Sequence, residues 1–289
     1  MRCRPKPSGE GCLLHGRAIG VRGAAPPPVT LPRRPVDRPH QGNGHMRSYA
    51  IGDIHGQIGL LARAHDRIAR DRGRTGDAKA PVVHLGDLVD RGPDSRGVVE
   101  YLWSGIAQGQ PWVVLKGNHD RMFAGYLSAI DWHDPGLRQD LSYLNPRIGG
   151  AATLASYGVR AAADRPLAPV WAEAVAAVPE HHRSFLEGLP GSYHRGEVLF
   201  VHAGIRPGVG LADQTETDLV WIRKDFLDDP RDHGALVVHG HTALDAPTHY
   251  GNRVNIDSSA GYGGPLTAIV IEGRDVWVLE DQGRTPLRP

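Results

Sequence analysis

The feature that most constrains this chain is a local pattern that occurs five times: a short β-prone apolar run ends abruptly in glycine and a side chain that can bind a metal. The runs lead into Gly52-Asp53-Ile54-His55-Gly56, Gly86-Asp87-Leu88-Val89-Asp90-Arg91-Gly92, Lys116-Gly117-Asn118-His119-Asp120, His202-Ala203-Gly204 and His239-Gly240-His241-Thr242. An open α/β sheet presents polar ligands in this way, beyond the C-terminal edges of its strands, where glycines permit tight turns. The pattern therefore predicts an α/β fold whose site is assembled at those edges.

Apolar residues at helical spacing follow the first and second of these runs; they are Leu60, Leu61, Ala64 and Ile68, then Val98, Val99 and Leu102. We expect crossover helices at both places and, with them, parallel pairing of the strands in this half of the chain. Near the C-terminus, three closely spaced apolar runs at 254–256, 267–271 and 276–279 predict an antiparallel finish instead.

Composition divides the chain into a tail and a domain. Residues 1–45 are rich in proline, glycine and arginine and lack a periodic apolar pattern, so we expect a disordered tail. Met46 stands directly before the first β-prone run and is a candidate initiator, with a genuine unstructured tail as the alternative. Residues 46–289 are expected to form one domain, with an insert at about 122–195 that carries helical patches such as 171–178.

Charge and hydropathy exclude several classes of protein. The net charge is +1, and no lysine run or basic helix stands out after residue 46, so nucleic acid is not an expected partner. No apolar run reaches the roughly 18 to 20 residues of a membrane span, and the N-terminus lacks the apolar segment of a signal peptide. We expect a cytoplasmic protein with no membrane partner, and the oligomeric state is left open.

Taken together and in this order, the five motifs make residues 48 to about 280 resemble the calcineurin-like metallophosphoesterases, and within them the phosphoprotein phosphatase branch with its bacterial and phage members. The resemblance implies a sandwich of mixed β-sheets flanked by α-helices, with a metal site at the strands' C-terminal ends. It also implies two divalent metal ions, with one held by Asp53 and His55, Asp87 bridging both, and the second completed by Asn118, His202 and His241. This donor set suits Mn²⁺, Fe or Zn²⁺ better than Ca²⁺, and we expect Mn²⁺.

The same resemblance implies a mechanism in which a metal-bridging hydroxide attacks phosphorus. His119 is then the general acid that protonates the leaving oxygen, with Asp90 orienting its imidazole. Arg91 and Arg223 are expected to bind the phosphate, since arginine offers paired donors that match phosphate oxygens.

The other histidines receive other interpretations. His241 is preferred to His239 as the ligand because the Gly-His-Thr motif matches it and alternate residues at a strand end face opposite ways. His84 is expected to be a residue of the sheet. Four further histidines are expected at the surface; they are His181, His182, His194 and His249.

The motifs leave three functions open. Asp90-Arg91-Gly92 and Trp221-Ile222-Arg223 favour a serine/threonine protein phosphatase that acts on a phosphorylated protein or another small phosphate monoester. Asp120 stands where the eukaryotic protein phosphatases usually carry glutamate, and Gly-Asn-His-Asp also occurs in relatives that split dinucleoside polyphosphates, so a diadenosine tetraphosphate hydrolase is the alternative. A non-catalytic binding module would be expected to have lost ligands, and none is missing from the sequence.

Overall fold

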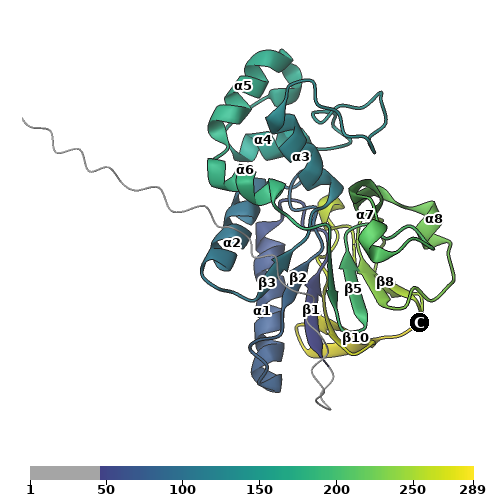
Figure 1. Cartoon of the computed structure of the whole chain (residues 1–289). Helices are drawn as coiled ribbons and strands as arrows, with labels where there is room; N and C mark the ends of the chain where they lie inside the picture. The colour runs from purple at the N-terminus through teal and green to yellow at the C-terminus, as the bar shows by residue number, and fades with distance from the viewer. Residues whose placement is uncertain (1–45) are drawn as a thin grey trace, which may run out of the picture. The chain divides into compact units, whose positions relative to one another are not determined.

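The computed structural model describes residues 46–289, so the expected disorder of residues 1–45 lies outside the described residues. Two β-sheets form the centre of this part of the chain (Figure 1). The strands of the first sheet are, in spatial order, β11 (Gly283–Leu287), β10 (Asp275–Glu280), β9 (Ala268–Glu272), β1 (Arg47–Ile51), β2 (Val82–His84) and β3 (Trp112–Val114). The strands of the second sheet are β4 (Ser192–Arg195), β5 (Val198–Val201), β6 (Leu236–His239), β8 (Arg253–Asn255) and β7 (Thr248–His249).

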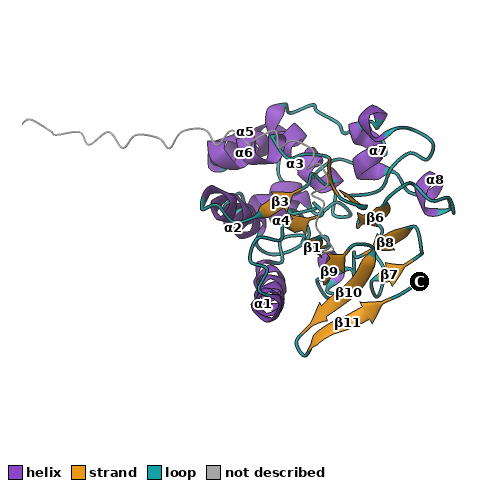
Figure 2. Cartoon of the chain, turned by 60° about the horizontal axis from the view of Figure 1, so that its bottom comes forward, coloured by secondary structure: helices purple, strands orange, loops and turns teal. Residues whose placement is uncertain are grey.

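Pairing within the first sheet follows the expectation from the sequence. The three strands β1, β2 and β3 are parallel, and the crossover helices α1 (Ile58–Thr75) and α2 (Ser95–Ala107) connect them. The strands β9 and β10 form an antiparallel hairpin, and β9 also pairs antiparallel with β1, so the chain's two described ends lie in one sheet (Figure 2).

The predicted antiparallel finish is wrong for one of its three runs. Residues 253–255 form β8, which belongs to the second sheet and pairs in parallel with β6. Its antiparallel neighbour is the two-residue strand β7, not a strand of the C-terminal hairpin. After β8, a loop and the short 3₁₀ helix η3 (Ala260–Tyr262) carry the chain across to β9 in the other sheet.

Alternation along the strands explains why the two sheets stack. In β1, Ala50 packs between the sheets, while Tyr49 and Ile51 face the helices on the outer side. In β5, Phe200 likewise faces the first sheet and Val201 faces outward. Because both faces of these strands are covered, their sequences read as continuous apolar runs instead of an alternating pattern.

Helices complete the sandwich on both sides (Figures 1 and 2). Both crossover helices pack on the outer face of the first sheet, through residues that include Leu61, Ile68, Val98 and Leu102. The short helices α7 (Glu216–Trp221) and α8 (Lys224–Leu227) cover the second sheet, where Phe226 is fully buried. The sandwich of mixed sheets flanked by α-helices is therefore confirmed.

Segment 122–195 contributes a helical layer at one end of the sandwich (Figure 1). It begins inside α3 (Asn118–Ser128), continues through α4 (Gly150–Ser156), α5 (Leu167–Ala177) and α6 (Glu180–Glu187), and ends with β4.

Between residues 46 and 289, no helix is both long and apolar enough to cross a membrane.

Candidate active site

The five motifs meet where the strands of the two sheets end. Backbone hydrogen bonds bring the loops together: the amides of Ile54 and His55 donate to the carbonyl of Asp87 at 3.1 and 2.8 Å, and Gly240 donates to the carbonyl of His202 at 2.8 Å. All six predicted metal ligands are buried in this region; they are Asp53, His55, Asp87, Asn118, His202 and His241. The structure therefore gathers the whole predicted ligand set.

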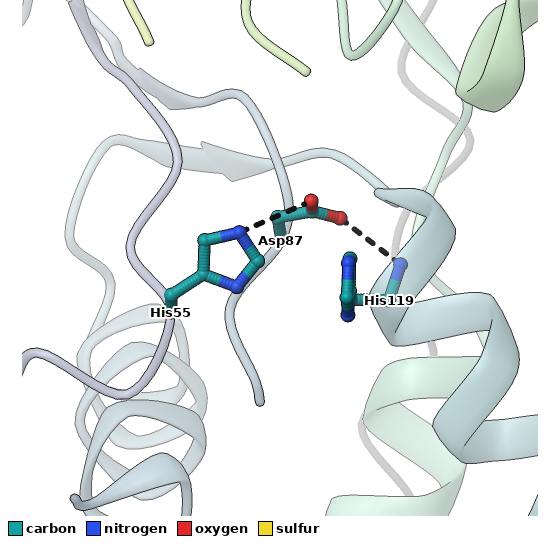
Figure 3. A group of neighbouring side chains, drawn as sticks. All are labelled: His55, Asp87 and His119. Atoms are coloured by element: carbon teal, nitrogen blue, oxygen red, sulfur yellow. Dashed lines mark hydrogen bonds and ion pairs between the residues drawn. The ribbon is translucent and has the colours of Figure 1, made fainter. Parts of the chain in front are cut away.

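Asp87 lies between two halves of this site. The first half contains Asp53 and His55, and the second contains Asn118, His202 and His241. Its Oδ2 is 3.4 Å from His55 Nε2, and its Oδ1 is 3.4 Å from His202 Nε2 (Figure 3 shows the first of these contacts). Asp87 Oδ1 also accepts a hydrogen bond of 3.0 Å from the backbone amide of His119. One carboxylate thus faces both halves, which is the placement that a bridging ligand needs.

In the first half, the tautomer of His55 is set by the backbone. Its Nδ1 lies 2.8 Å from the carbonyl oxygen of Val89, which can only accept, so Nδ1 carries the proton and the lone pair of Nε2 faces the site. Burial lowers the pKa of His55 well below its usual value, so the ring is neutral. Asp53 Oδ2 accepts from the backbone amide of His241 at 3.0 Å.

The second half brings two acceptor atoms, His202 Nε2 and Asn118 Oδ1, together with no proton between them. His202 Nδ1 donates to the carbonyl of Leu85 at 2.9 Å, which leaves Nε2 as a lone pair. That lone pair lies 3.0 Å from Asn118 Oδ1, and His241 Nδ1 lies 2.9 Å from the same oxygen. Burial also lowers the pKa of His202, so the ring does not gain the second proton that would relieve this contact. Acceptor atoms held this closely suit a shared cation.

Two further observations indicate that divalent metal ions fit these residues. Among the described residues, Asp53 Oδ1 and His241 Nε2 are buried polar atoms without a hydrogen-bond partner. Burial, together with the charges of Asp257 and Asp87, raises the pKa of Asp53 well above its usual value. A metal ion would satisfy both atoms and offset the cost of burying these carboxylates. Two groups of side chains have ligand atoms close enough to hold an ion; they are His55, Asp87 and His119, and Asp87, His202 and His241.

Backbone strain is concentrated at the site. Seven described residues other than glycine have a positive φ, and five of them belong to the motifs; they are His55, Asp87, Asp90, Arg91 and His241, with φ from 46° to 72°. Such conformations are costly for residues with a Cβ and persist where the surrounding structure imposes them, often at functional sites.

The general acid assigned from the sequence has a buried partner. His119 Nδ1 lies 2.6 Å from Asp90 Oδ2, as expected. The other carboxylate oxygen, Asp90 Oδ1, accepts hydrogen bonds of 2.7 Å from the hydroxyls of Tyr143 and Thr153. The Asp90 amide donates to Thr153 Oγ1 and Ser95 Oγ at 2.8 and 3.1 Å. Asp90 is completely buried, so its orientation toward His119 is fixed from every side.

Two arginines border the site. Arg91 donates through Nη1 to His55 Nε2 at 2.6 Å and through Nη2 to His119 Nε2 at 2.9 Å, and its guanidinium lies 4.6 Å from the centre of the Tyr262 ring. Arg223 is exposed and donates through Nη2 to the carbonyl of His241 at 3.3 Å. Both predicted phosphate-binding side chains therefore reach the ligand cluster from its solvent side.

His239 and Asp120 lie in the motifs but are not predicted metal ligands, and both make contacts that hold the surrounding loops and strands in place. His239 faces away from the site: Arg253 Nη1 lies 3.3 Å from its Nε2, its ring packs on Phe226, and burial lowers its pKa to about 3. Asp120 accepts hydrogen bonds from the amides of Leu88 and Gly117 at 2.9 and 2.8 Å, so it joins the second and third loops.

Sequence reasoning missed three residues at the site. Asp257 follows β8 and is buried beside Asp53 and Asp87, and burial raises its pKa to about 6. Its position after the apolar run 254–256 was a usable sign, since it repeats the strand-end pattern without the glycine. Tyr143 and Thr153 lie in the insert, where no sequence pattern marked them.

Comparisons with known proteins agree with this arrangement. Residues 46–270 match the family model described as calcineurin-like phosphoesterase. A bis(5'-nucleosyl)-tetraphosphatase PrpE [asymmetrical] of Geobacillus thermodenitrificans is 27% identical over 247 residues, which cover 76% of this chain and 88% of that protein. A crystal structure of a putative diadenosine tetraphosphatase aligns with a TM-score of 0.53 at 23% identity, over 85% of this chain and 96% of its own.

A second solved structure carries a different name. The cold-active protein-tyrosine phosphatase of a Shewanella species aligns with a TM-score of 0.56 at 17% identity and covers 85% of this chain and 81% of its own. At these identities the two structures show a shared fold only.

Proposed function

The chain belongs to the calcineurin-like phosphoesterase family, and within it we propose that it hydrolyses phosphate monoesters of aliphatic alcohols, with phosphoserine or phosphothreonine of a protein as the substrate. The single observation that carries this proposal is the buried contact of 2.6 Å between Asp90 and His119. An alkoxide is a poor leaving group that must gain a proton as it departs, whereas a phosphate or nitrophenolate leaves without one. A fixed acid beside the site therefore supports an ester of an aliphatic alcohol.

Each residue has a defined task in this proposal. Asp53, His55, Asp87, Asn118, His202 and His241 would hold two divalent ions, for which we propose Mn²⁺. When bound, such ions activate water and neutralise charge on the phosphate. Arg91 and Arg223 bind and orient the phosphate oxygens through charge-assisted hydrogen bonds.

The proton on His119 depends on its two neighbours. In the structure Asp90 accepts from Nδ1 and Nε2 accepts from Arg91, and once Nε2 carries a proton instead, Asp90 stabilises the resulting imidazolium. A phosphate that takes over the guanidinium of Arg91 leaves His119 Nε2 available to carry the proton to the leaving oxygen.

A second candidate function is the asymmetrical hydrolysis of dinucleoside tetraphosphates. The names of several relatives support it, including the PrpE proteins of Geobacillus and Anoxybacillus at 27% and 25% identity. A cavity of about 460 Å³ beside Arg91 also supports it: the cavity is lined by Arg147 and Tyr262, and Tyr262 is 66% exposed. An exposed ring could stack on a base, and arginine could pair with further phosphates.

One parallel assay separates the candidates. The Mn²⁺-loaded chain is given a phosphoserine peptide, a phosphotyrosine peptide and diadenosine tetraphosphate at equal concentrations, and kcat/KM is measured for each. We expect the phosphoserine peptide to give the highest value. A higher value for diadenosine tetraphosphate would replace the first proposal with the second.

A further inference from the structure

A histidine that was expected at the surface is fully buried beside a glutamate. The His182 side chain has no exposed area, although its neighbour His181 remains 38% exposed. Both residues lie in the first turn of α6, and they face Glu100 of the neighbouring helix α2. The predicted surface position of His182 is therefore wrong, because α6 packs this ring against α2 and the end of α4.

The three side chains point their ligand atoms at one place. Glu100 Oε2 lies 2.8 Å from His182 Nε2 and 3.3 Å from His181 Nε2, and the three atoms all lie within 4.8 Å of one another. Metal–nitrogen distances of about 2.0 to 2.1 Å in a tetrahedral zinc site place neighbouring ligand atoms roughly 3.3 Å apart. The two Glu100–histidine distances are near that spacing, and the half-exposed side chains of Glu100 and His181 can adjust to complete it.

The imidazoles are positioned by the fold. Tyr157 Oη lies 2.8 Å from His182 Nδ1, and Tyr157 is itself buried. Metal-binding histidines usually have such a partner on the second ring nitrogen, which fixes the direction of the first. The ring of His181 packs on Trp103, with ring centres 4.4 Å apart.

The protonation states suit a cation. Burial lowers the pKa of His182, so its ring is neutral near pH 7. Partial burial raises the pKa of Glu100, but hydrogen bonds from His182 and His181 outweigh that effect and hold it below its usual value. Zinc binding at Nε2 moves the proton of each neutral ring to Nδ1, where Tyr157 Oη can accept it from His182. The cluster then offers two imidazoles and one carboxylate anion, with one side open to solvent through Glu100 and His181.

We propose that Glu100, His181 and His182 form a third metal site, separate from the strand-end centre, which binds Zn²⁺ and joins α2 to α6. Two imidazoles favour Zn²⁺ over Mg²⁺ or Mn²⁺, and a three-ligand set leaves a fourth position for water. Among the described residues this is the one metal-competent group that shares no member with the strand-end centre.

The test counts bound zinc in the full chain. The original chain and its variants are equilibrated with a slight excess of Zn²⁺, passed through a desalting column and analysed for metal by mass spectrometry. Glu100→Gln and His181→Gln should each hold one zinc equivalent fewer than the original chain. The matched control is His194→Gln, which changes an exposed histidine of β4 and should lose no zinc.

A melting experiment gives an independent result. With the strand-end centre saturated by Mn²⁺, micromolar Zn²⁺ should raise the melting temperature of the original chain and the His194 variant by a few degrees, because a ligand that binds the folded state stabilises it. The Glu100 and His181 variants should show no such rise. Equal zinc counts in the cluster variants and the original chain, or an equal rise in melting temperature, would overturn the proposal. Unchanged p-nitrophenyl phosphate hydrolysis by the cluster variants establishes that they are folded.

Discussion

Asp90, which contacts the proposed general acid His119, illustrates how many hydrogen bonds can hold one buried side chain. Its carboxylate accepts from His119, Tyr143 and Thr153, and its amide is held as well. Hydrogen bonds to a charged group contribute about 1.5 to 3 kcal/mol each, so the buried anion is compensated by neutral hydroxyls instead of a second cation. The remaining partner is His119, whose Nδ1 donates to Asp90 Oδ2 and which the proposed mechanism uses as the proton donor.

Replacing His119 should therefore have an effect that depends on the leaving group. We expect His119→Asn to lower kcat/KM by roughly 10²- to 10⁴-fold for a phosphoserine peptide, whose alkoxide needs a proton. The same variant should lose far less with p-nitrophenyl phosphate, since nitrophenolate departs unprotonated. Asp90→Asn should give the same pattern more mildly, because it only misorients the acid and weakens its charge.

Arg91→Ala is the contrasting variant for this experiment. Both substrates present the same phosphate, so its loss should damage both to a similar extent. Equal losses on the two substrates for His119→Asn, or the disappearance of a bound metal, would instead make His119 a ligand or a phosphate-binding residue.

Asp257 makes a separate prediction about pH and stability. Burial raises its pKa from 3.8 to about 6 in the folded chain without metal. The folded state then binds this proton more tightly than the unfolded state. Protonation of Asp257 therefore contributes fully to the free energy of unfolding below about pH 4, and this contribution is lost as the pH rises through 6. Asp257→Asn cannot ionise, and Asn Oδ1 can still accept from the Ser259 amide as Asp257 Oδ1 does at 3.0 Å.

The metal-stripped Asp257→Asn variant should accordingly gain stability relative to the original chain between pH 4 and pH 7. The gain that corresponds to this pKa difference is about 3 kcal/mol. Urea unfolding in chelator at several pH values measures it. Parallel stability curves for the two proteins would show that Asp257 is not the group that titrates.

At the level of elements, the ends of the strands carry both the predicted metal ligands and most of the non-glycine residues with positive φ. A glycine is needed where one strand-end loop passes a ligand of another: a Cβ at Gly240 would collide with Asp53 Oδ1, and one at Gly117 would collide with Asp87 Oδ1. The φ of Gly240 is not positive, so this close approach, not backbone conformation, explains the glycine.

Gly240→Ala should therefore displace Asp53 and weaken metal binding. We expect a loss of bound metal, at least a tenfold loss of activity, and a cost of about 1 to 3 kcal/mol from overpacking. Metal analysis, kinetics and urea unfolding test these three effects.

Gly59→Ala is the matched control in this experiment. Gly59 lies in α1, and a Cβ there meets no other atom within 4 Å. That change should leave activity intact and stabilise the helix by about 0.5 to 1 kcal/mol. Full metal binding by the Gly240→Ala variant would show that a Cβ at this position does not displace Asp53.

For the whole molecule, the site was more predictable than the arrangement around it. The strand-end motifs that contain Asp53, Asp87 and His241 are local in sequence, and the family resemblance that they carry supplied the predicted ligand roles. The sheet to which residues 253–255 belong could not be predicted, because strands covered on both faces have the same apolar sequence in either sheet. The contacts of Tyr143 and Thr153 with Asp90 span 53 and 63 residues and depend on how the helical layer folds over the site.

The central claim, that catalysis depends on divalent metal ions held by this strand-end centre, is tested most directly by removing and returning the metal. The full chain is stripped with chelator until mass spectrometry finds no metal, and p-nitrophenyl phosphate hydrolysis is then measured as Mn²⁺ is added back. We predict that the stripped chain is inactive and that activity returns as the centre fills, reaching its plateau near two equivalents. Undiminished hydrolysis by the verified metal-free chain would contradict this account of the site.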